Sequence, residues 1–567
     1  MSLTREAQLL IQKMVKSPPL KAFSIFNSSI LRGFHHTHQS ISFILHQLLA
    51  SNLISHAQSL FLQVLSGRLS SPFFTPCSLL GHLTQPNLNP TSVCGHLYEA
   101  IVNAHVQSQS PEQALYFLKQ MVEQGLVPRS NTFNNLLGFL VKAKDHGKAW
   151  RVFDEFKGKV ELDVYSFGIV MKSCCEAGNL DRGFELLIEL EGLGWAPNVV
   201  LYTTLIDGCC KNGYLERAKK MFCKIEEVGL VANQYTYTVL IHGFFKKGYK
   251  KDGFELYEKM KSNGVVPNVC TYTCLINECC SNGEVKRALK LFDEMRERGV
   301  ARNVVAYNTV IGGLCKEMRI WEADNFVNRM KREGISPNVV TYNALIEGFC
   351  NVGELGRASS LFNQLKSSGQ SPTLVTYNVL IQGFARAQNS ARVSNLVREM
   401  SDRGVSPSKV TYTILIDGLV RSGDTERAFQ IFSSMEKAGV VPDVYTYGVL
   451  IHGSCTKGDM KEASKLFKSM SDKHLNPNDV IFNMMIHGYY REGSSYRALR
   501  LLKEMRRNGM IPNVASYSST IGVLCNDGKW EEAEMLLKDM TESGLKPPVS
   551  LYNLISRVKF NKTLVKL

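Results

Sequence analysis

Small polar residues recur at a fixed interval along this chain of 567 residues. Thirteen copies of one segment follow each other from Gly95 to Pro548, each 35 residues long except the copy at Ser130, which has 34. The fifth residue of a copy is Asn, Thr, Gly or Ser in every case but Glu99. Asn, Thr and Gly each cost a few tenths to about 1 kcal/mol relative to Ala inside a helix. Helix packing alone does not require this restricted set of residue types, so we infer that the fifth-position residues serve contacts outside the packing.

The last residue of each copy is also polar in most cases. It is Asn in seven copies, Asp at Asp163 and Asp443, and a hydroxyl residue at Thr373 and Ser408. An ionised Asp side chain only accepts hydrogen bonds, whereas an Asn amide can also donate. The same residue types are ordinary N-caps when they stand just before a helix. Taken alone, this position fits capping and contact with a ligand equally well.

Two helices in each copy must position these residues. The copy at Val339 has apolar residues at i, i+3, i+4 and i+7 in two segments, which are Tyr342, Leu345, Ile346, Phe349 and Ala358, Leu361, Phe362, Leu365. Gly353 separates the segments, and Gly369 with Pro372 ends the unit, because neither residue favours continuing a helix there. Such a hairpin needs a like neighbour on each side to bury both apolar faces. We therefore predict an all-α fold, a right-handed α-solenoid superhelix of about thirteen 35-residue helix-turn-helix repeats.

Charge and cysteine usage constrain the function less. The net charge is +15, but residues 1–94 carry six Lys or Arg with one acid, and residues 549–567 carry four with none. A polyanionic partner is therefore only weakly indicated. The chain has 15 cysteines and no C-x-x-C motif, and seven Cys occupy the twelfth position of their copies, which favours packing over metal ligation or disulfides. We expect no cofactor and no metal, and the lack of an 18-residue apolar stretch predicts no membrane span.

The segments outside the copies differ in character. Residues 1–37 combine scattered basic residues, one acid and apolar residues at helical spacing, which is typical of an organelle transit peptide. A disordered basic tail is the alternative. Residues 38–94 are interpreted as a degenerate helical hairpin cap and a linker, and three residues of the cap match the second-helix spacing, namely Ala57, Leu60 and Phe61. Residues 95–548 hold the thirteen repeats, and residues 549–567 hold a partial repeat and a basic C-terminal tail.

The repeated motif reads V-V-T-Y-N-x-L-I-x-G-x-C, then A-x-x-L-F-x-x-M, then G-x-x-P-N, at a period of 35 residues. It resembles the pentatricopeptide repeat family, and in particular its P class of unbroken 35-residue motifs. Tetratricopeptide repeats have a period of 34 and open with W-x-x-L-G-x-x-Y, and neither feature describes this chain. The resemblance covers about four-fifths of the chain. It implies an α-solenoid of plant organelles that binds single-stranded RNA, one base per repeat.

In this family the fifth and last residues of a repeat together read one base. An Asp at the last position suits uracil N3–H or guanine N1–H, and an Asn there can donate to cytosine N3 or adenine N1. Family usage associates Thr or Ser at the fifth position with purines and Asn with pyrimidines. The implied pairs are Asn134 with Asp163, Gly168 with Asn198, Thr203 with Asn233, Thr238 with Asn268, Thr273 with Asn303, Asn308 with Asn338, Asn343 with Thr373, Asn378 with Ser408, Thr413 with Asp443, Gly448 with Asn478, and Asn483 with Asn513. The end copies, with Glu99 and Arg129 or Ser518 and Pro548, depart from the family's pairs and stay unread.

The family's orientation places the N-terminus of the protein toward the 5′ end of the RNA. In that orientation the pairs predict the core 5′-UAAAAYYCGAY-3′, in which Y is a pyrimidine. Guanine at the ninth nucleotide follows from Thr413 and Asp443. The two glycine pairs predict their adenines weakly.

Two further positions complete the implied RNA site. Family members sandwich each base between flat or branched second residues, which here are Val200, Tyr235, Val305, Val340, Val375, Val410, Tyr445 and Val480. The thirteenth residue is basic in six copies and could meet a phosphate at the edge of the groove, namely Lys142, Lys211, Lys246, Lys316, Arg421 and Arg491. Packing at the helix start and a solvated basic side chain are the respective alternatives.

No catalytic constellation accompanies the repeats. A zinc deaminase would need H-x-E with C-x-x-C, and a nucleotide-binding loop would need a Walker motif, and the sequence has neither. We therefore expect a binding protein and not an enzyme. One function class is sequence-specific binding of single-stranded organellar RNA in transcript splicing, stabilisation or translation, with other RNA-processing factors as further partners. The other is a protein-binding α-solenoid scaffold without RNA specificity. The expected compartment is the mitochondrion, with the chloroplast as the alternative.

Overall fold

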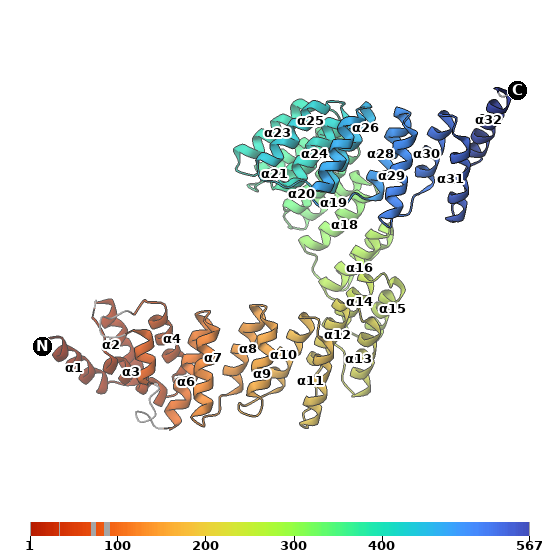
Figure 1. Cartoon of the computed structure of the whole chain (residues 1–567). Coiled ribbons are helices and arrows are strands. Elements are labelled where there is room, and N and C mark those ends of the chain that lie inside the picture. The colour runs from red at the N-terminus through yellow and green to blue at the C-terminus, as the bar shows by residue number, and fades with distance from the viewer. Residues whose placement is uncertain (1, 33, 70–74, 84–90, 566–567) are drawn as a thin grey trace. The chain divides into compact units, whose positions relative to one another are not determined.

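Helices make up all the regular secondary structure in the part of the chain that the computed structural model describes, residues 2–32, 34–69, 75–83 and 91–565 (Figure 1). They are numbered α1 to α32 in chain order. Within that range, no helix combines the length and apolar character that crossing a membrane requires. The predicted all-α repeat solenoid is confirmed.

The first helices of the repeats begin at the predicted residues in every copy but the first. They are α6 (Thr91–Gln107), α8 (Ser130–Lys142), α10 (Val164–Glu176), α12 (Val199–Asn212), α14 (Gln234–Lys246), α16 (Val269–Ser281), α18 (Val304–Lys316), α20 (Val339–Asn351), α22 (Leu374–Arg386), α24 (Lys409–Arg421), α26 (Val444–Lys457), α28 (Asp479–Glu492) and α30 (Val514–Asn526). The first copy differs because α6 begins at Thr91, ahead of the expected Gly95.

A second helix follows each first helix after a short turn. The second helices are α7 (Pro111–Glu123), α9 (His146–Phe156), α11 (Leu180–Gly192), α13 (Leu215–Glu227), α15 (Lys250–Ser262), α17 (Val285–Glu297), α19 (Ile320–Arg332), α21 (Leu355–Ser367), α23 (Ser390–Asp402), α25 (Thr425–Lys437), α27 (Met460–Asp472), α29 (Ser495–Arg507) and α31 (Trp530–Glu542). Gly353 after α20 has a φ of 83°, and Gly369 after α21 has a φ of 76°. Glycine adopts these left-handed values without steric cost, which explains why it ends both helices.

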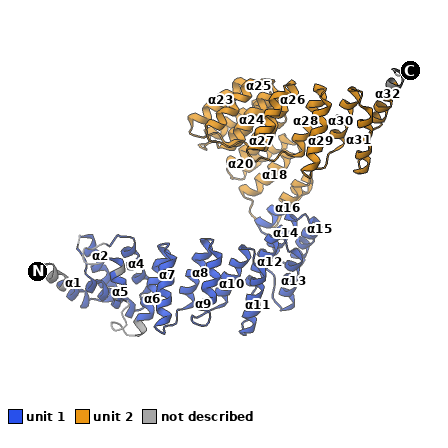
Figure 2. Cartoon of the chain, in the orientation of Figure 1, with its two compact units in different colours: residues 1–274 blue, residues 275–567 orange. Residues whose placement is uncertain are grey.

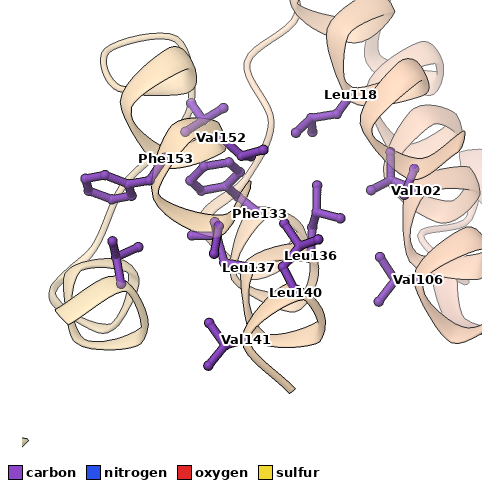
Figure 3. Packing of buried hydrophobic residues seen from close by; sticks show 14 of the residues in the cluster. Val102, Val106, Leu118, Phe133, Leu136, Leu137, Leu140, Val141, Val152 and Phe153 are labelled. Carbon is purple, nitrogen blue, oxygen red and sulfur yellow. The ribbon is translucent and has the colours of Figure 1, made fainter. Parts of the chain in front are cut away.

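Each first helix other than α16 packs against its own second helix and against the preceding repeat. Figure 3 shows this around α8, where side chains from α6, α7 and α9 surround Phe133, Leu136, Leu137 and Leu140. Fourth-position aromatics extend the packing further along the chain. The ring of Tyr307 meets that of Phe292 at 4.9 Å between centroids and 77° between planes, an edge-to-face contact. The predicted apolar faces are thus buried between successive hairpins.

Successive first helices approach closely where the tenth residue of a repeat is glycine. A Cβ added to Gly313 in α18 would lie 2.6 Å from the Cβ of Cys280 in α16, closer than real Cβ contacts allow. The same arrangement places Gly383 in α22 against Cys350 in α20. Cysteine at these twelfth positions therefore fills the small space beside a glycine of the next helix, in keeping with the packing role that the sequence predicted.

The N-terminal segments are also helical where the structure describes them. Residues 1–37 contain α1 (Ser2–Val15) and α2 (Pro19–Leu31), and their role as an import signal stays a prediction. The expected cap contains α3 (His38–Ala50) and α4 (Ile54–Leu65), and the buried side chains of α4 include Ala57, Leu60 and Phe61. The expected linker contains α5 (Pro76–Leu83), while residues 70–74 and 84–90 lie outside the described residues. At the other end, the partial repeat forms α32 (Val549–Val565), and residues 566–567 of the expected tail are not described.

The chain divides into two compact units, residues 1–274 and 275–567 (Figure 2). The boundary falls inside α16. The first unit holds the fifth-position residues from Glu99 to Thr273, and the second holds those from Asn308 to Ser518. The structure therefore presents the predicted base-reading residues as two separate series.

Candidate nucleic-acid interface

The last residue of most repeats caps the first helix of the next repeat. The Oδ1 atom of Asn338 accepts a hydrogen bond from the backbone N–H of Thr341 at 3.1 Å. The same type of bond is made by Asp163, Asn198, Asn233, Asn268, Asn303, Thr373, Ser408, Asp443, Asn478 and Asn513. Arg129 makes no such side-chain bond. The capping interpretation of this position is therefore correct for these residues.

Capping occupies only one of the two polar atoms that an Asn or Asp side chain carries. The cap is made by Oδ1, which leaves Nδ2 of an Asn or Oδ2 of an Asp out of the cap. An Asn thereby keeps its donor group, and an Asp keeps an acceptor. Capping and ligand contact, which the sequence left as alternatives, are thus compatible in one side chain.

Fifth-position side chains bond to the third residue of the following repeat. Thr341 Oγ1 donates to Asn308 Oδ1 at 2.6 Å, and Thr376 Oγ1 donates to Asn343 Oδ1 at 2.8 Å. Such pairs are formed by Thr203 with Thr236, Thr238 with Thr271, Asn308 with Thr341, Asn343 with Thr376, Asn378 with Thr411, Thr413 with Thr446, and Asn483 with Ser516. The third-position hydroxyls in these pairs are buried.

The fifth-position threonines donate their hydroxyl proton to a backbone carbonyl oxygen of their own helix. Thr203 Oγ1 donates to the carbonyl oxygen of Val199 at 2.6 Å. Three more fifth-position threonines donate to the carbonyl four residues earlier, namely Thr238, Thr273 and Thr413. A hydroxyl has one proton, so beyond this bond each of these oxygens can only accept.

The two fifth-position glycines meet apolar side chains instead. A Cβ on Gly168 would lie 3.1 Å from Leu201 Cδ2, and one on Gly448 would lie 3.6 Å from Ile481 Cγ1. Leu201 and Ile481 are the third residues of the following repeats and are buried. The next helix thus crowds the position of a side chain at residue 168, whereas a Cβ at residue 448 would make an ordinary van der Waals contact.

In the first readable pair the fifth and last residues bond directly to each other. Asn134 Nδ2 donates to Asp163 Oδ1 at 3.1 Å and to Oδ2 at 3.3 Å. Burial raises the pKa of Asp163, but hydrogen bonds from Ser166 and Asn134 outweigh burial and hold it below its usual value. The carboxylate therefore stays ionised at neutral pH and acts only as an acceptor.

A cavity of about 270 Å³ brings together the residues implied to read guanine. Its walls include Val410 and Tyr445, the second residues of successive repeats, and both are exposed. Thr413 and Asp443 also line it, and Thr413 is buried. The cavity thus joins a flat ring, a branched apolar side chain and two polar side chains, an arrangement that suits a stacked base with a hydrogen-bonded edge.

Basic side chains border the same cavity. Arg386, Lys409 and Arg421 line it, and the Arg421 guanidinium pairs with Asp417 at 2.9 Å. Lys211, another thirteenth residue, pairs with Asp207 at 2.6 Å. These carboxylates offset part of the positive charge at two of the six positions implied to contact phosphate.

The second-position side chains, which the resemblance implies to stack on the bases, lie at the surface. Second-position side chains are exposed, namely Val200, Tyr235, Val305, Val340, Val375, Val410, Tyr445 and Val480. Glu99, in the unread first copy, is buried, and its carboxylate accepts a bond from the Arg129 backbone N–H at 3.2 Å. That bond engages the Glu99 carboxylate within the protein.

Sequence reasoning missed the third-position hydroxyls and Lys409. Thr or Ser stands at the third position in nine of the thirteen copies, and this recurrence was a usable signal. Lys409 gave no such signal, because the first residue of a repeat is apolar in most copies and the ion pair with Asp443 depends on tertiary structure. Among the described residues, no group of three or more His, Cys, Asp or Glu side chains could hold a metal ion.

Comparison with known families gives consistent matches along the repeats. A model described as the PPR repeat family matches residues 128–176, 197–246, 237–281, 267–305, 302–351, 337–386, 372–421, 410–456 and 477–526. The pentatricopeptide repeat domain matches residues 435–492, and a single PPR repeat matches residues 165–195 and 515–545.

Individual relatives match shorter parts of the chain. A pentatricopeptide repeat-containing protein of Arabidopsis thaliana is 55% identical over 201 residues, which are 35% of this chain and 35% of that protein. A mitochondrial pentatricopeptide repeat-containing protein of the same plant is 32% identical over 108 residues, 19% of this chain and 27% of that protein. The chain thus spans 35% of the length of the first relative and 27% of the length of the second.

Among solved structures, the pentatricopeptide repeat protein PPR10 from maize is similar, with a TM-score of 0.49 and 21% sequence identity. That similarity covers 98% of this chain and 91% of the maize chain. The family matches themselves extend over more than half of this chain, so the chain belongs to the pentatricopeptide repeat family.

Proposed function

We propose that this chain binds single-stranded RNA with sequence preference, one base per repeat, through the fifth and last residues of its repeats. The observation that carries the proposal is the cavity formed by Val410, Tyr445, Thr413 and Asp443. Its exposed apolar walls offer a stacking platform, and its polar side chains offer an edge to read. Such stacking contributes about 1–3 kcal/mol per base in single-strand binding proteins.

The hydrogen-bonding groups left over by the fold support the assignment of bases. At Asp443 the Oδ2 atom is outside the cap and can accept from guanine N1–H. At Asn338 the Nδ2 group is outside the cap and can donate to a ring nitrogen. The proposed core is 5′-UAAAAYYCGAY-3′, and the residues that read it are the eleven pairs from Asn134 with Asp163 to Asn483 with Asn513.

The test is a binding titration of the full chain at physiological salt. The RNA 5′-UAAAACUCGAC-3′ is compared with a scrambled RNA of the same composition, so that charge and length are matched. We expect the designed RNA to bind at least tenfold more tightly. Equal affinity for both RNAs would refute base reading, because phosphate contacts alone do not depend on sequence. Failure to bind either RNA would refute RNA binding altogether and favour the protein-scaffold alternative.

We further propose that the protein acts in the mitochondrion, in splicing, stabilisation or translation of a transcript. Several relatives carry the word mitochondrial in their names, including the one that is 32% identical over 108 residues. The basic, nearly acid-free residues 1–37 also support import. Residues 1–60 fused to a fluorescent reporter should direct it to mitochondria in plant cells, and a diffuse cytosolic signal would contradict the proposal. A plastid signal would favour the chloroplast alternative.

A further inference from the structure

We propose that a hydroxyl at the third position of a repeat is a positioning group that sets the hydrogen-bonding polarity of the fifth residue in the preceding repeat. The inference rests on the proposed RNA-binding function and adds to it a residue that meets no base itself. Seven pairs carry it, from Thr203 with Thr236 to Asn483 with Ser516. The third residue thereby becomes a determinant of which base class the preceding repeat accepts.

At asparagine repeats the hydroxyl holds the carbonyl end of the amide. Thr376 Oγ1 accepts from the Thr373 backbone N–H at 3.0 Å and donates to Asn343 Oδ1 at 2.8 Å. With Oδ1 engaged in this way, the amide presents its Nδ2 donor to a ligand. Both pyrimidines carry a carbonyl oxygen, O2, beside N3, so a fixed donor is a shared complement for cytosine and uracil. Rotation of the amide by a half-turn would replace that donor with an acceptor.

At threonine repeats the same hydroxyl acts on a group of opposite polarity. With the Thr203 proton on the Val199 carbonyl, Thr236 is the donor in the 2.7 Å contact with Thr203, which is shorter than the 3.1 Å contact of Thr236 Oγ1 with Asn233 Oδ1. Thr203 then offers the ligand an acceptor and no donor. Asparagine and threonine repeats therefore differ in hydrogen-bonding polarity, and in both a hydroxyl of the next repeat contacts the fifth residue.

Helix capping uses these hydroxyls but does not require them. The third-position hydroxyl also accepts from the backbone N–H of the last residue before it, which completes a capping box, at Thr341, Thr376, Thr411 and Ser516. Asn198 caps the N–H of Leu201 at 3.1 Å, and Asn478 caps the N–H of Ile481 at 3.0 Å, with no hydroxyl at the third position. These two third residues are the ones that follow the fifth-position glycines. A hydroxyl is thus dispensable for the cap bond that the last residue's side chain makes, and in these repeats it is absent where the preceding fifth residue has no side chain to orient.

Thr376→Val tests the inference at the seventh nucleotide, because valine keeps the shape of threonine and removes the hydroxyl. Affinities of the full chain are measured for four RNAs that differ only at that nucleotide. We expect wild type to prefer a pyrimidine there and the variant to lose about tenfold of that preference. Thr376→Ser, which restores the hydroxyl, should retain the preference. The base preference at the ninth nucleotide should not change. A general loss of stability would instead weaken the preference at both nucleotides.

Thr132→Val is the matched control. Thr132 is also a buried third residue, but its hydroxyl accepts from Asn103 Nδ2 at 3.2 Å and follows the unread Glu99. Its removal should leave every base preference unchanged. Ser516→Ala, beside Asn483, repeats the test at the eleventh nucleotide and keeps the inference falsifiable if Thr376→Val does not fold. We expect the pyrimidine preference to fall at that nucleotide alone.

The outcomes distinguish the positioning role of the third-position hydroxyl from base reading by the fifth and last residues. Wild-type preference with unchanged preference in Thr376→Val and Ser516→Ala would overturn the positioning role and leave RNA reading intact. Absence of any preference in wild type would overturn both. The chain also provides an internal comparison, because Thr273 is followed by Ala306, which has no hydroxyl. Selectivity for adenine should therefore be weaker at the fifth nucleotide than at the third and fourth, and equal selectivity would count against the inference.

Discussion

The Lys409 ammonium lies 2.9 Å from Oδ2 of Asp443, while Oδ1 of the same carboxylate accepts from the Thr446 backbone N–H at 3.0 Å. One oxygen of Asp443 thus caps α26, and the other faces a cation at the wall of the cavity that we propose holds guanine. Burial raises the pKa of Asp443, but hydrogen bonds from Thr446 and Lys409 outweigh burial and keep it below its usual value. The carboxylate is therefore an obligate acceptor at neutral pH.

Asp443→Asn should move the base preference at the ninth nucleotide from guanine toward adenine. The amide can keep the cap through Oδ1 while Nδ2 replaces the acceptor Oδ2, so it can donate to adenine N1. Binding is measured on RNAs that differ only at that nucleotide. Asp459→Asn is the control, because Asp459 caps the second helix α27 through the Glu462 N–H. An unchanged preference in Asp443→Asn would contradict the assignment of Asp443 as a base-reading residue.

Acid should remove the contribution of Asp443 to stability. Its pKa is lowered in the folded chain, so the unfolded chain binds more protons between the folded and unfolded pKa values, and stability rises with pH there. The contribution is present above about pH 4, the ordinary Asp range, and is lost as the pH falls through the folded value. Urea unfolding of wild type and Asp443→Asn at several pH values between 7 and 3 measures this. The stability difference between them should shrink toward low pH, and a constant difference would contradict the expected linkage.

Two adjacent glycines in α18 should respond oppositely to alanine. A Cβ on Gly313 would meet Cys280 at 2.6 Å, so Gly313→Ala should reduce the free energy of unfolding by about 1–3 kcal/mol. A Cβ on Gly312 meets nothing within 4 Å, so Gly312→Ala should be neutral or stabilise by up to about 1 kcal/mol through helix propensity. Thermal or urea unfolding of the two variants decides between them. Equal effects would show that helix separation at this point is not limiting.

Buried cysteines should resist alkylation in the native chain. Burial raises the pKa of Cys175, Cys315, Cys350 and Cys455 to about 12, so almost no thiolate exists at pH 8. Cys223 and Cys270 are exposed. Mass spectrometry after a short iodoacetamide treatment at pH 8 should find label on the exposed pair, with label on the buried thiols only after unfolding. Early labelling of Cys350 would indicate that the repeats open locally.

The sequence by itself determined the helices and their order. Three features show this: the 35-residue period, the apolar spacing in each half of a repeat and the glycines after each helix. They are readable from the sequence because each depends on the conformational preferences of residues that are close together in the chain. They place the start of α20 at Val339 and of α26 at Val444, as the structure does. The packing role of the twelfth-position cysteines was visible as a recurrence, whereas their contact with a glycine of the next helix was found only in the structure.

Tertiary structure alone decided how the polar side chains are used. The sequence could not distinguish capping from ligand contact at Asn338 or Asp443, because both uses favour the same residue types. Only the positions of the atoms show that Oδ1 makes the cap and leaves the second polar atom free of it. The bond from Thr341 to Asn308 joins residues 33 apart in the chain, so its geometry depends on how one repeat packs on the next. That packing joins the recurring fifth-position residues to the recurring third-position hydroxyls by hydrogen bonds, although each recurrence is visible in the sequence by itself.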